Sequence, residues 1–264
     1  MLIQVEINFG RGIGDDREAL EDVAETYLGA LHHAGQLCGD DIQTWIDSEF
    51  VVTAKMAGLG AEKKSSHSSW GLKHLKVVKE KFGCGPDWTI HDDETPKRNI
   101  TWKGAGELVL FTHAFDDDSP VCRTDIAEQV PVFLLPVSEE VKEDLGRWQD
   151  LFVLHDRMWL ASGALEMPAY RESALPNSEL SEYGRDLCKA VEKATKVPTY
   201  YFLMRYYSHP TQEFARRCPG CGGKWRTQAP EESRHRDWHF RCKRCRLVSN
   251  AGVEPNRRLA RIGS

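Results

Sequence analysis

The sequence predicts an α+β protein in which a mixed α+β domain precedes a small four-cysteine zinc ribbon rich in β-hairpin. Strand-like and helix-like segments alternate without the regularity of a βαβ array. Two Cys-x2-Cys pairs stand close together in the C-terminal fifth of the chain. The composition changes there too, because residues 209–264 hold thirteen Lys and Arg but five Asp and Glu. We therefore expect an acidic α+β domain at 1–208 and a basic zinc-ribbon domain at 209–264.

The charge of the whole chain hides this division. The 264 residues carry 35 Lys and Arg and 40 Asp and Glu, which leaves residues 1–208 with 22 basic and 35 acidic side chains. A basic segment attached to an acidic body indicates that the segment meets a polyanion or an acidic protein surface.

The elements of the first domain follow from hydrophobic periodicity. Ile3, Val5, Ile7 and Phe9 alternate with polar residues, which predicts a half-buried strand over residues 2–9. Asp15 and Glu18 resemble a capping box that opens a helix ending at Gly35. Further strands are predicted at 49–56, 107–115, 130–135 and 199–207, helices at 65–82, 136–159 and 178–195, and a loop at 83–106.

Composition and cysteine usage favour a cytoplasmic protein without membrane contact. Mean hydropathy is −0.51, and no apolar run approaches the ~18 residues that a membrane span needs. No basic stretch precedes the first apolar residues, so we do not expect a signal peptide. The eight cysteines are not distributed like a disulfide framework, since four of them cluster in the basic segment.

The strongest motif is a pair of cysteine knuckles. Cys218 and Cys221 are followed after twenty residues by Cys242 and Cys245. This spacing is typical of a four-thiolate Zn²⁺ site, in which two tight turns each direct two sulfur atoms to one ion. The intervening segment is long enough for a hairpin with strands at 224–228 and 238–242 and a loop at 229–235.

Two other interpretations of the cysteines remain open. His235 and His239 have the spacing of a two-cysteine, two-histidine finger with Cys218 and Cys221. This finger would leave Cys242 and Cys245 without a role, and the polar run before His235 supplies no helix core. A redox dithiol pair is the other alternative, although nothing around the motifs indicates a thioredoxin-like fold.

Cations and aromatic rings surround the knuckles. Arginines attract phosphates and aromatic rings offer faces on which bases stack, so the segment is a candidate nucleic-acid interface for RNA or single-stranded DNA. The alternative is that one tryptophan fills a small core and the arginines are solvated. The predicted contact residues are Arg226, Trp238, Arg241, Lys243, Arg244 and Arg246.

The C-terminal motif also resembles a known family. The segments Cys218-Pro-Gly-Cys-Gly-Gly-Lys-Trp225 and Phe240-Arg-Cys-Lys-Arg-Cys-Arg-Leu-Val-Ser-Asn250 look like the signature of uncharacterised bacterial proteins described as zinc-ribbon-containing. Nucleic-acid binding has been suggested for that family, and the resemblance implies no more about function than this. The lead-in at 199–207 and the N-terminal strand and helix fit the resemblance as well.

Other residues are weaker candidates for functional sites. Cys84 and Cys122 would form half of a second metal site if the fold brought them together, Asp116–Asp118 follow a buried strand, and His155 lies on an apolar helix stripe. Phosphate loops, nucleophile elbows and His-Glu-x-x-His motifs are absent from the sequence. We therefore expect a non-enzymatic binding protein. The alternatives are a protein-interaction module of adaptor or neutralising type, and an enzyme whose active site lies in the first domain.

Overall fold

The computed structural model describes residues 2–14, 16–91, 98–227 and 238–264 of a mixed α+β protein. The chain forms two compact units. One comprises residues 1–101, 117–119 and 129–146, and the other comprises 102–116, 120–128 and 147–264. This division differs from the boundary expected at residue 208, because strands on both sides of that residue belong to one sheet of the second unit.

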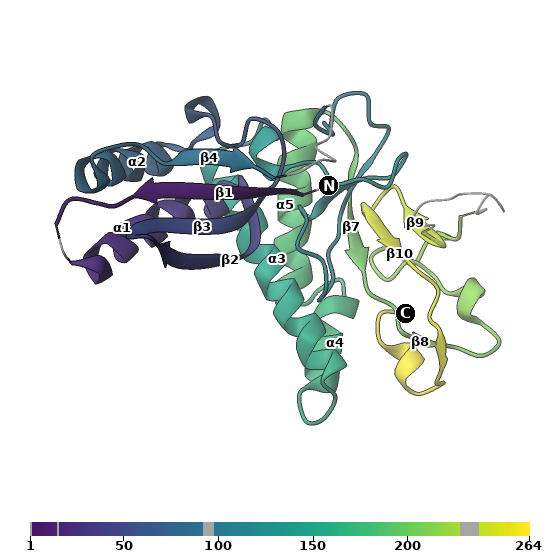
Figure 1. Ribbon diagram of the computed structural model, residues 1–264. Coiled ribbons are helices and arrows are strands. Elements are labelled where there is room, and N and C mark those ends of the chain that lie inside the picture. The colour runs from purple at the N-terminus through teal and green to yellow at the C-terminus, as the bar shows by residue number, and fades with distance from the viewer. Residues whose placement is uncertain (1, 15, 92–97, 228–237) are drawn as a thin grey trace. The chain divides into compact units, whose positions relative to one another are not determined.

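The first unit is built on an antiparallel four-stranded sheet (Figure 1). The chain runs β-α-β-β-α-β and the strand order is β2-β3-β1-β4, which is the ferredoxin-like arrangement. The elements are β1 (Ile3–Gly10), α1 (Arg17–His33), β2 (Leu37–Ile46), β3 (Glu49–Met56), α2 (Ser69–Phe82) and β4 (Asp87–Ile90).

The predicted first strand is confirmed, and its alternation explains the core of this unit. Along β1, the apolar side chains from Ile3 to Phe9 are fully buried, whereas Gln4 is exposed. Tyr27 of α1 and Val78 of α2 belong to the same buried cluster. Both helices therefore cover one face of the sheet. The carboxylate of Asp16 caps α1 by accepting from the Ala19 N–H, while Asp15, the predicted cap, lies outside the described residues.

A half-buried histidine should make the stability of this unit depend on pH. The Tyr27 hydroxyl lies 2.8 Å from His67 Nε2, and His67 Nδ1 lies 2.9 Å from the Lys63 carbonyl oxygen. With the proton on Nδ1, the ring donates to Lys63 and accepts from Tyr27. Burial lowers the pKa of His67, outweighing the opposite effect of the Lys63 carbonyl.

We expect the free energy of unfolding to decrease as the pH falls below the ordinary imidazole pKa of about 6.5. The unfolded chain then takes up a proton that the folded His67 resists, and the contribution is complete above that pH. Urea unfolding at pH 7.5 and pH 5 measures the decrease. The His67→Gln variant should show a smaller decrease than the natural chain, and equal decreases would assign the effect elsewhere.

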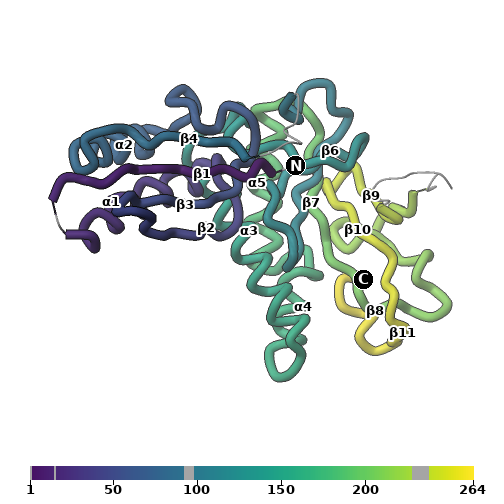
Figure 2. Tube along the Cα trace, viewed as in Figure 1, coloured from purple at the N-terminus to yellow at the C-terminus, as the bar shows by residue number. Residues whose placement is uncertain are grey.

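The second unit contains a five-stranded mixed sheet in the order β6-β5-β7-β10-β9. Its three central strands, β5, β7 and β10, are parallel, and the two edge strands are antiparallel to their neighbours. A short parallel pair, β8 and β11, lies outside this sheet (Figure 2). The strands are β5 (Leu108–Leu110), β6 (Val121–Arg123), β7 (Thr199–Leu203), β8 (Tyr207–Ser208), β9 (Phe240–Cys242), β10 (Leu247–Ser249) and β11 (Glu254–Pro255).

The helices of this unit are α4 (Glu166–Ala174), α5 (Glu179–Thr195) and, from residue 147 onward, α3 (Glu139–Leu160). The close packing of α5 on β7 depends on Gly184, where an added Cβ would lie 2.3 Å from the Tyr201 ring. Trp148 packs on the same ring, at 5.8 Å between centroids, and donates its indole N–H to the Leu180 carbonyl. This aromatic core packs helices against the sheet to which the cysteine knuckles are attached.

Several elements differ from their prediction. The strand predicted at 130–135 is wrong, because the segment forms a 3-10 turn at Val132–Leu134 between two prolines that lack the N–H of a strand ladder. The loop predicted at 83–106 contains the short strand β4, which pairs with β1. Neither β2 nor α4 was predicted. The expected strand at 199–207 is divided into β7 and β8.

Candidate metal centre and basic cavity

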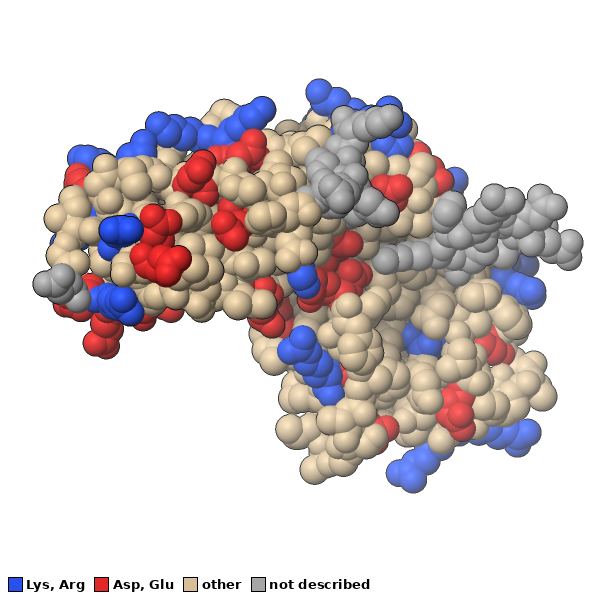
Figure 3. All heavy atoms as spheres, viewed as in Figure 1, with Lys and Arg blue, Asp and Glu red and all other residues tan. Residues whose placement is uncertain are grey.

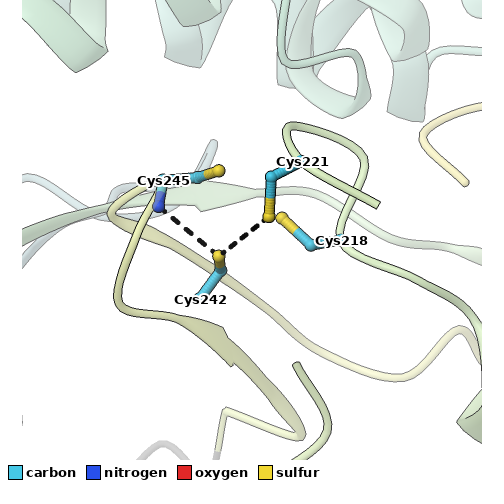
Figure 4. Close-up of side chains that lie close together, drawn as sticks. All are labelled: Cys218, Cys221, Cys242 and Cys245. Carbon is cyan, nitrogen blue, oxygen red and sulfur yellow. Dashed lines mark hydrogen bonds between the residues drawn. The ribbon is translucent and has the colours of Figure 1, made fainter. Parts of the chain in front are cut away.

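The two cysteine knuckles come together as the sequence predicts. The sulfur atoms of Cys218, Cys221, Cys242 and Cys245 all lie within 4.8 Å of one another (Figure 4). Sulfur atoms 2.3 Å from a tetrahedral zinc ion are ~3.8 Å apart, and the Cys221 and Cys242 sulfurs are 3.7 Å apart. The four thiols therefore have the donor chemistry and the spacing of a metal site.

Local backbone geometry builds the first knuckle. The Gly222 N–H donates to the Cys218 carbonyl at 2.8 Å, and the Cys218 N–H donates to the Gly223 carbonyl at 2.9 Å. Gly222 has a φ of +69°, which an L side chain rarely adopts. At Gly220 an added Cβ would lie 3.0 Å from the Cys245 sulfur. Gly220 therefore allows the two turns to approach closely, and Gly222 allows the first turn to close.

The second knuckle joins two strands. Cys242 ends β9 and Cys245 precedes β10, and the Cys245 N–H donates to the Cys242 sulfur at 3.4 Å. The hairpin of the ribbon is therefore β9–β10. The strand predicted at 224–228 is limited, among the described residues, to one antiparallel bridge between Arg226 and Phe240. Because β10 also pairs with β7, the cysteine cluster is anchored to the main sheet of its unit.

The thiols differ in their surroundings. Burial raises the pKa of Cys218 to about 11. The Gly223 N–H lowers the pKa of Cys221 to about 7, because a backbone donor stabilises the thiolate.

A buried aromatic pair supports the knuckles. Trp225 is 2 % exposed and packs on Phe240 at 5.2 Å between ring centroids. The guanidinium of Arg216 lies 4.5 Å from the Trp225 ring centre and 3.8 Å from that of Phe240. Burial lowers the pKa of Arg216 to about 9. Trp225 thus fills a small core, as the alternative expects, but Arg216 is a packed structural cation and not a solvated one.

A polar cavity of about 350 Å³ lies beside the cysteine cluster. Cys221 and Cys245 contribute to its wall, and Thr199 and Arg246 place it at the amino ends of β7 and β10. Four cations and one carboxylate line it, namely Arg185, Lys189, Arg244, Arg246 and Glu192. The excess of cations makes the cavity suitable for an anion. The two cations from α5, Arg185 and Lys189, were missed because the sequence assigns that helix to the acidic domain.

Three of the six predicted contact residues are exposed. Lys243 and Arg244 lie in the turn of the second knuckle. Arg226 is exposed as well, and its guanidinium lies 4.5 Å from the centre of the Phe214 ring. No carboxylate pairs with these three side chains within the part of the chain that the structure describes.

The other three predicted contact residues are held by neighbours. Arg241 forms an ion pair with Glu107 at 3.2 Å, and Arg246 forms one with Glu192 at 2.8 Å. Trp238 packs against two phenylalanine rings of the same unit, Phe111 and Phe202. The six residues therefore do not form one exposed contact surface.

The structure gives little support to the alternative metal sites. His235 lies outside the described residues, and Nδ1 of His239 accepts from the Ala251 N–H. Cys84 and Cys122 belong to different units. Among residues 2–14, 16–91, 98–227 and 238–264, the one group of side chains spaced for a metal ion is the cysteine cluster.

Comparisons with known proteins identify the bacterial family of this chain. A family model described as "Domain of unknown function (DUF2310)" matches residues 103–204, and one described as "Domain of unknown function (DUF8594)" matches residues 208–254. An "Uncharacterized protein" of Haemophilus influenzae is 33 % identical over 246 residues, which cover 88 % of this chain and 91 % of that protein. The chain belongs to the same family as this bacterial protein.

A second Haemophilus influenzae relative, also described as "Uncharacterized protein", is 33 % identical over 144 residues, or 54 % of this chain and 70 % of that protein. No solved structure matches the chain. The second DUF match contains all four clustered cysteines, and the DUF2310 match contains Arg185 and Lys189. The cavity of this family member is thus assembled from both matched segments.

None of the helices in the described part of the chain combines the length and the apolar character needed to cross a bilayer.

Proposed function

We propose that the four cysteines hold one structural Zn²⁺ ion and that the protein binds RNA or single-stranded DNA through the adjoining cavity. Four thiolates from two knuckles are the ligand set that zinc favours in structural sites. The ion would hold β9 and the first knuckle against β10. The cations would then bind phosphate groups, with the turn of the second knuckle at the mouth of the cavity.

One observation carries the nucleic-acid proposal. Arg185 and Lys189, far from the knuckles in sequence, line the same cavity as Arg244. The ion pair between Lys189 and Asp186 is exposed on both sides and therefore weak, so it does not prevent Lys189 from binding phosphate. A concave site suits a single strand, whose flexible backbone can place a phosphate in it.

The first unit has a basic surface of its own on α2. Charge reversal there is a matched control for charge reversal at the cavity. Lys73, Lys76 and Lys79 are exposed on α2, and Figure 3 shows Lys and Arg side chains along the edge that this helix forms. A variant of α2 changes the net charge as much as a variant of α5 does. It therefore separates a local effect at the cavity from a general effect of charge.

The double variant Arg185→Glu and Lys189→Glu should weaken binding of a labelled 20-nucleotide single strand by ~10-fold or more in 50 mM salt. It should also flatten the salt dependence, by ~0.7 log unit per log unit of salt for each phosphate that the variant no longer binds. Fluorescence anisotropy at several salt concentrations gives both quantities. Lys73→Glu with Lys76→Glu should leave affinity and slope nearly unchanged.

Two results would contradict the proposal. Equal decreases in affinity in both double variants would show that net charge or α2 accounts for binding. No retention of RNA or DNA, single- or double-stranded, at low salt would exclude nucleic acid. That result would favour the alternative of a protein-interaction module, since Arg241 and Arg246 already pair with carboxylates in the structure.

A further inference from the structure

A second cavity lies in the second unit, at the opposite ends of the parallel strands from the basic cavity. It measures about 510 Å³, within the range of small-molecule sites. Its wall includes Phe111 after β5, Arg205 after β7 and Asn250 after β10. Crevices at the carboxyl ends of parallel strands are where open α/β sheets bind ligands.

Seven of the fifteen residues that line this cavity are Phe, Tyr or Trp. Phe152 and Trp159 come from one face of α3, and Phe202 and Trp238 face the cavity together with Tyr206. The rings pack on one another, with 4.9 Å between the centroids of Phe202 and Trp238. The faces of such rings attract organic cations, most strongly where water is excluded.

A buried carboxylate completes the wall. Asp156 is 6 % exposed and lines the cavity from α3, one turn after Phe152. Its Oδ2 accepts from the Ala114 N–H at 2.7 Å. Within the described residues no Lys or Arg forms an ion pair with it. The carboxylate is therefore fixed in place by the backbone and has no Lys or Arg partner among the described residues. Burial raises the pKa of Asp156, and the Ala114 N–H and His113, which also lines the cavity, act in the opposite direction.

The one arginine in the wall does not offer an anion site. Arg205 donates from Nε and Nη2 to the two carboxylate oxygens of Glu213, at 3.0 and 2.9 Å. Its Nη1 donates to the Ile262 carbonyl at 2.6 Å. With these donors engaged, the carboxylate of Asp156 is the charged group of the wall that forms no ion pair with Lys or Arg among the described residues.

We propose that this cavity binds a small organic cation, with the ammonium group at Asp156 and the hydrocarbon part against the aromatic rings. The aromatic wall and the unpaired buried carboxylate together select a positively charged, partly apolar molecule over a neutral or anionic one of the same size. This proposal does not rest on nucleic-acid binding, and Trp238 and Asn250 of the wall adjoin the strands β9 and β10 that the proposed zinc ion would hold.

Three probes of similar size test the charge preference on the full-length protein. Phenethylamine is a cation at pH 7.5, 2-phenylethanol is neutral and phenylacetate is an anion. Isothermal titration should show that the cation binds ~10-fold or more tightly than either of the others. If the neutral or anionic probe binds as tightly, or if none binds at millimolar concentration, the proposal is wrong. This comparison needs no variant, so it does not depend on a variant's folding.

The Asp156→Asn variant then assigns the preference to one residue. The amide oxygen can still accept from Ala114, so the cavity should persist while phenethylamine loses its advantage over 2-phenylethanol. Asp150→Asn removes the same charge from the same helix, and Asp150 does not line the cavity. An unchanged preference in folded Asp156→Asn protein, or a loss of preference in Asp150→Asn, would overturn the assignment.

Discussion

Replacing Cys242 with serine should release the proposed zinc ion and unfold β9, β10 and the first knuckle. Structural zinc contributes about 10–16 kcal/mol of apparent binding free energy in zinc-finger peptides at neutral pH, so the destabilisation should far exceed that of a normal core substitution. Because β10 pairs with β7, the damage should extend into the main sheet of the second unit. The antiparallel sheet of the first unit does not contain these strands and should persist.

Hydrogen exchange measured by mass spectrometry locates the effect. Amides at 218–225 and 240–249 should lose protection in Cys242→Ser and in chelator-treated protein, those of β7 should lose part of it, and those of β1 should keep it. Metal analysis should give one zinc per natural chain and none in the variant. Cys122→Ser, a buried cysteine in β6 outside the cluster, is the matched control and should retain the metal. Full protection of β10 without metal would refute a structural role for the ion.

Neutralising Glu213 should cost about 3–5 kcal/mol of unfolding free energy, because it leaves buried arginine charges without a partner. The Glu213 carboxylate accepts from Arg205, and its Oε1 lies 3.4 Å from Nε of Arg216. It also accepts from the backbone N–H groups of His209 and Gly252 at 3.0 and 3.1 Å. The side chains of both arginines and of Glu213 are at most 8 % exposed.

Denaturant unfolding of Glu213→Gln measures this cost, with Glu254→Gln as an exposed control in the same region. Burial alone would raise the pKa of Glu213, but Arg205 and the two backbone donors hold it below the ordinary value. The stabilisation should thus be complete at neutral pH and be lost as the pH falls below about 4.5. A decrease no larger than that of the control would mean that the buried arginines find other partners.

The sequence was most informative where chemistry imposes a strict spacing. The two knuckles specify the cysteine cluster, and the alternation from Ile3 to Phe9 specifies β1, because both patterns are local. The pairing of β10 with β7 was not predictable, since a parallel pair between residues 201 and 247 has no local signature. The cations of α5 were missed because composition assigns that helix to the acidic domain, whereas the fold brings it to the cysteine cluster.

The candidate site shows a second limit of sequence reasoning. Arg216, Arg241 and Arg246 look alike in sequence as members of a basic cluster. In the structure Arg216 is packed on aromatic rings, and the other two are paired with Glu107 and Glu192. Acidic residues from elements distant in sequence therefore determine which arginines can bind a ligand. In the composition these acidic residues are counted only as members of an acidic domain.

The central place of β10 has a consequence for synthesis of the protein. One edge of β7 is covered by β5, but the other is completed by a strand that is translated more than forty residues later. At ~5–20 residues per second, that edge stays open for several seconds on the ribosome. An open strand edge is a template for pairing with other chains. If β10 needs the proposed zinc ion to fold, a shortage of zinc would prolong this interval, and the nascent protein should then depend more heavily on chaperones.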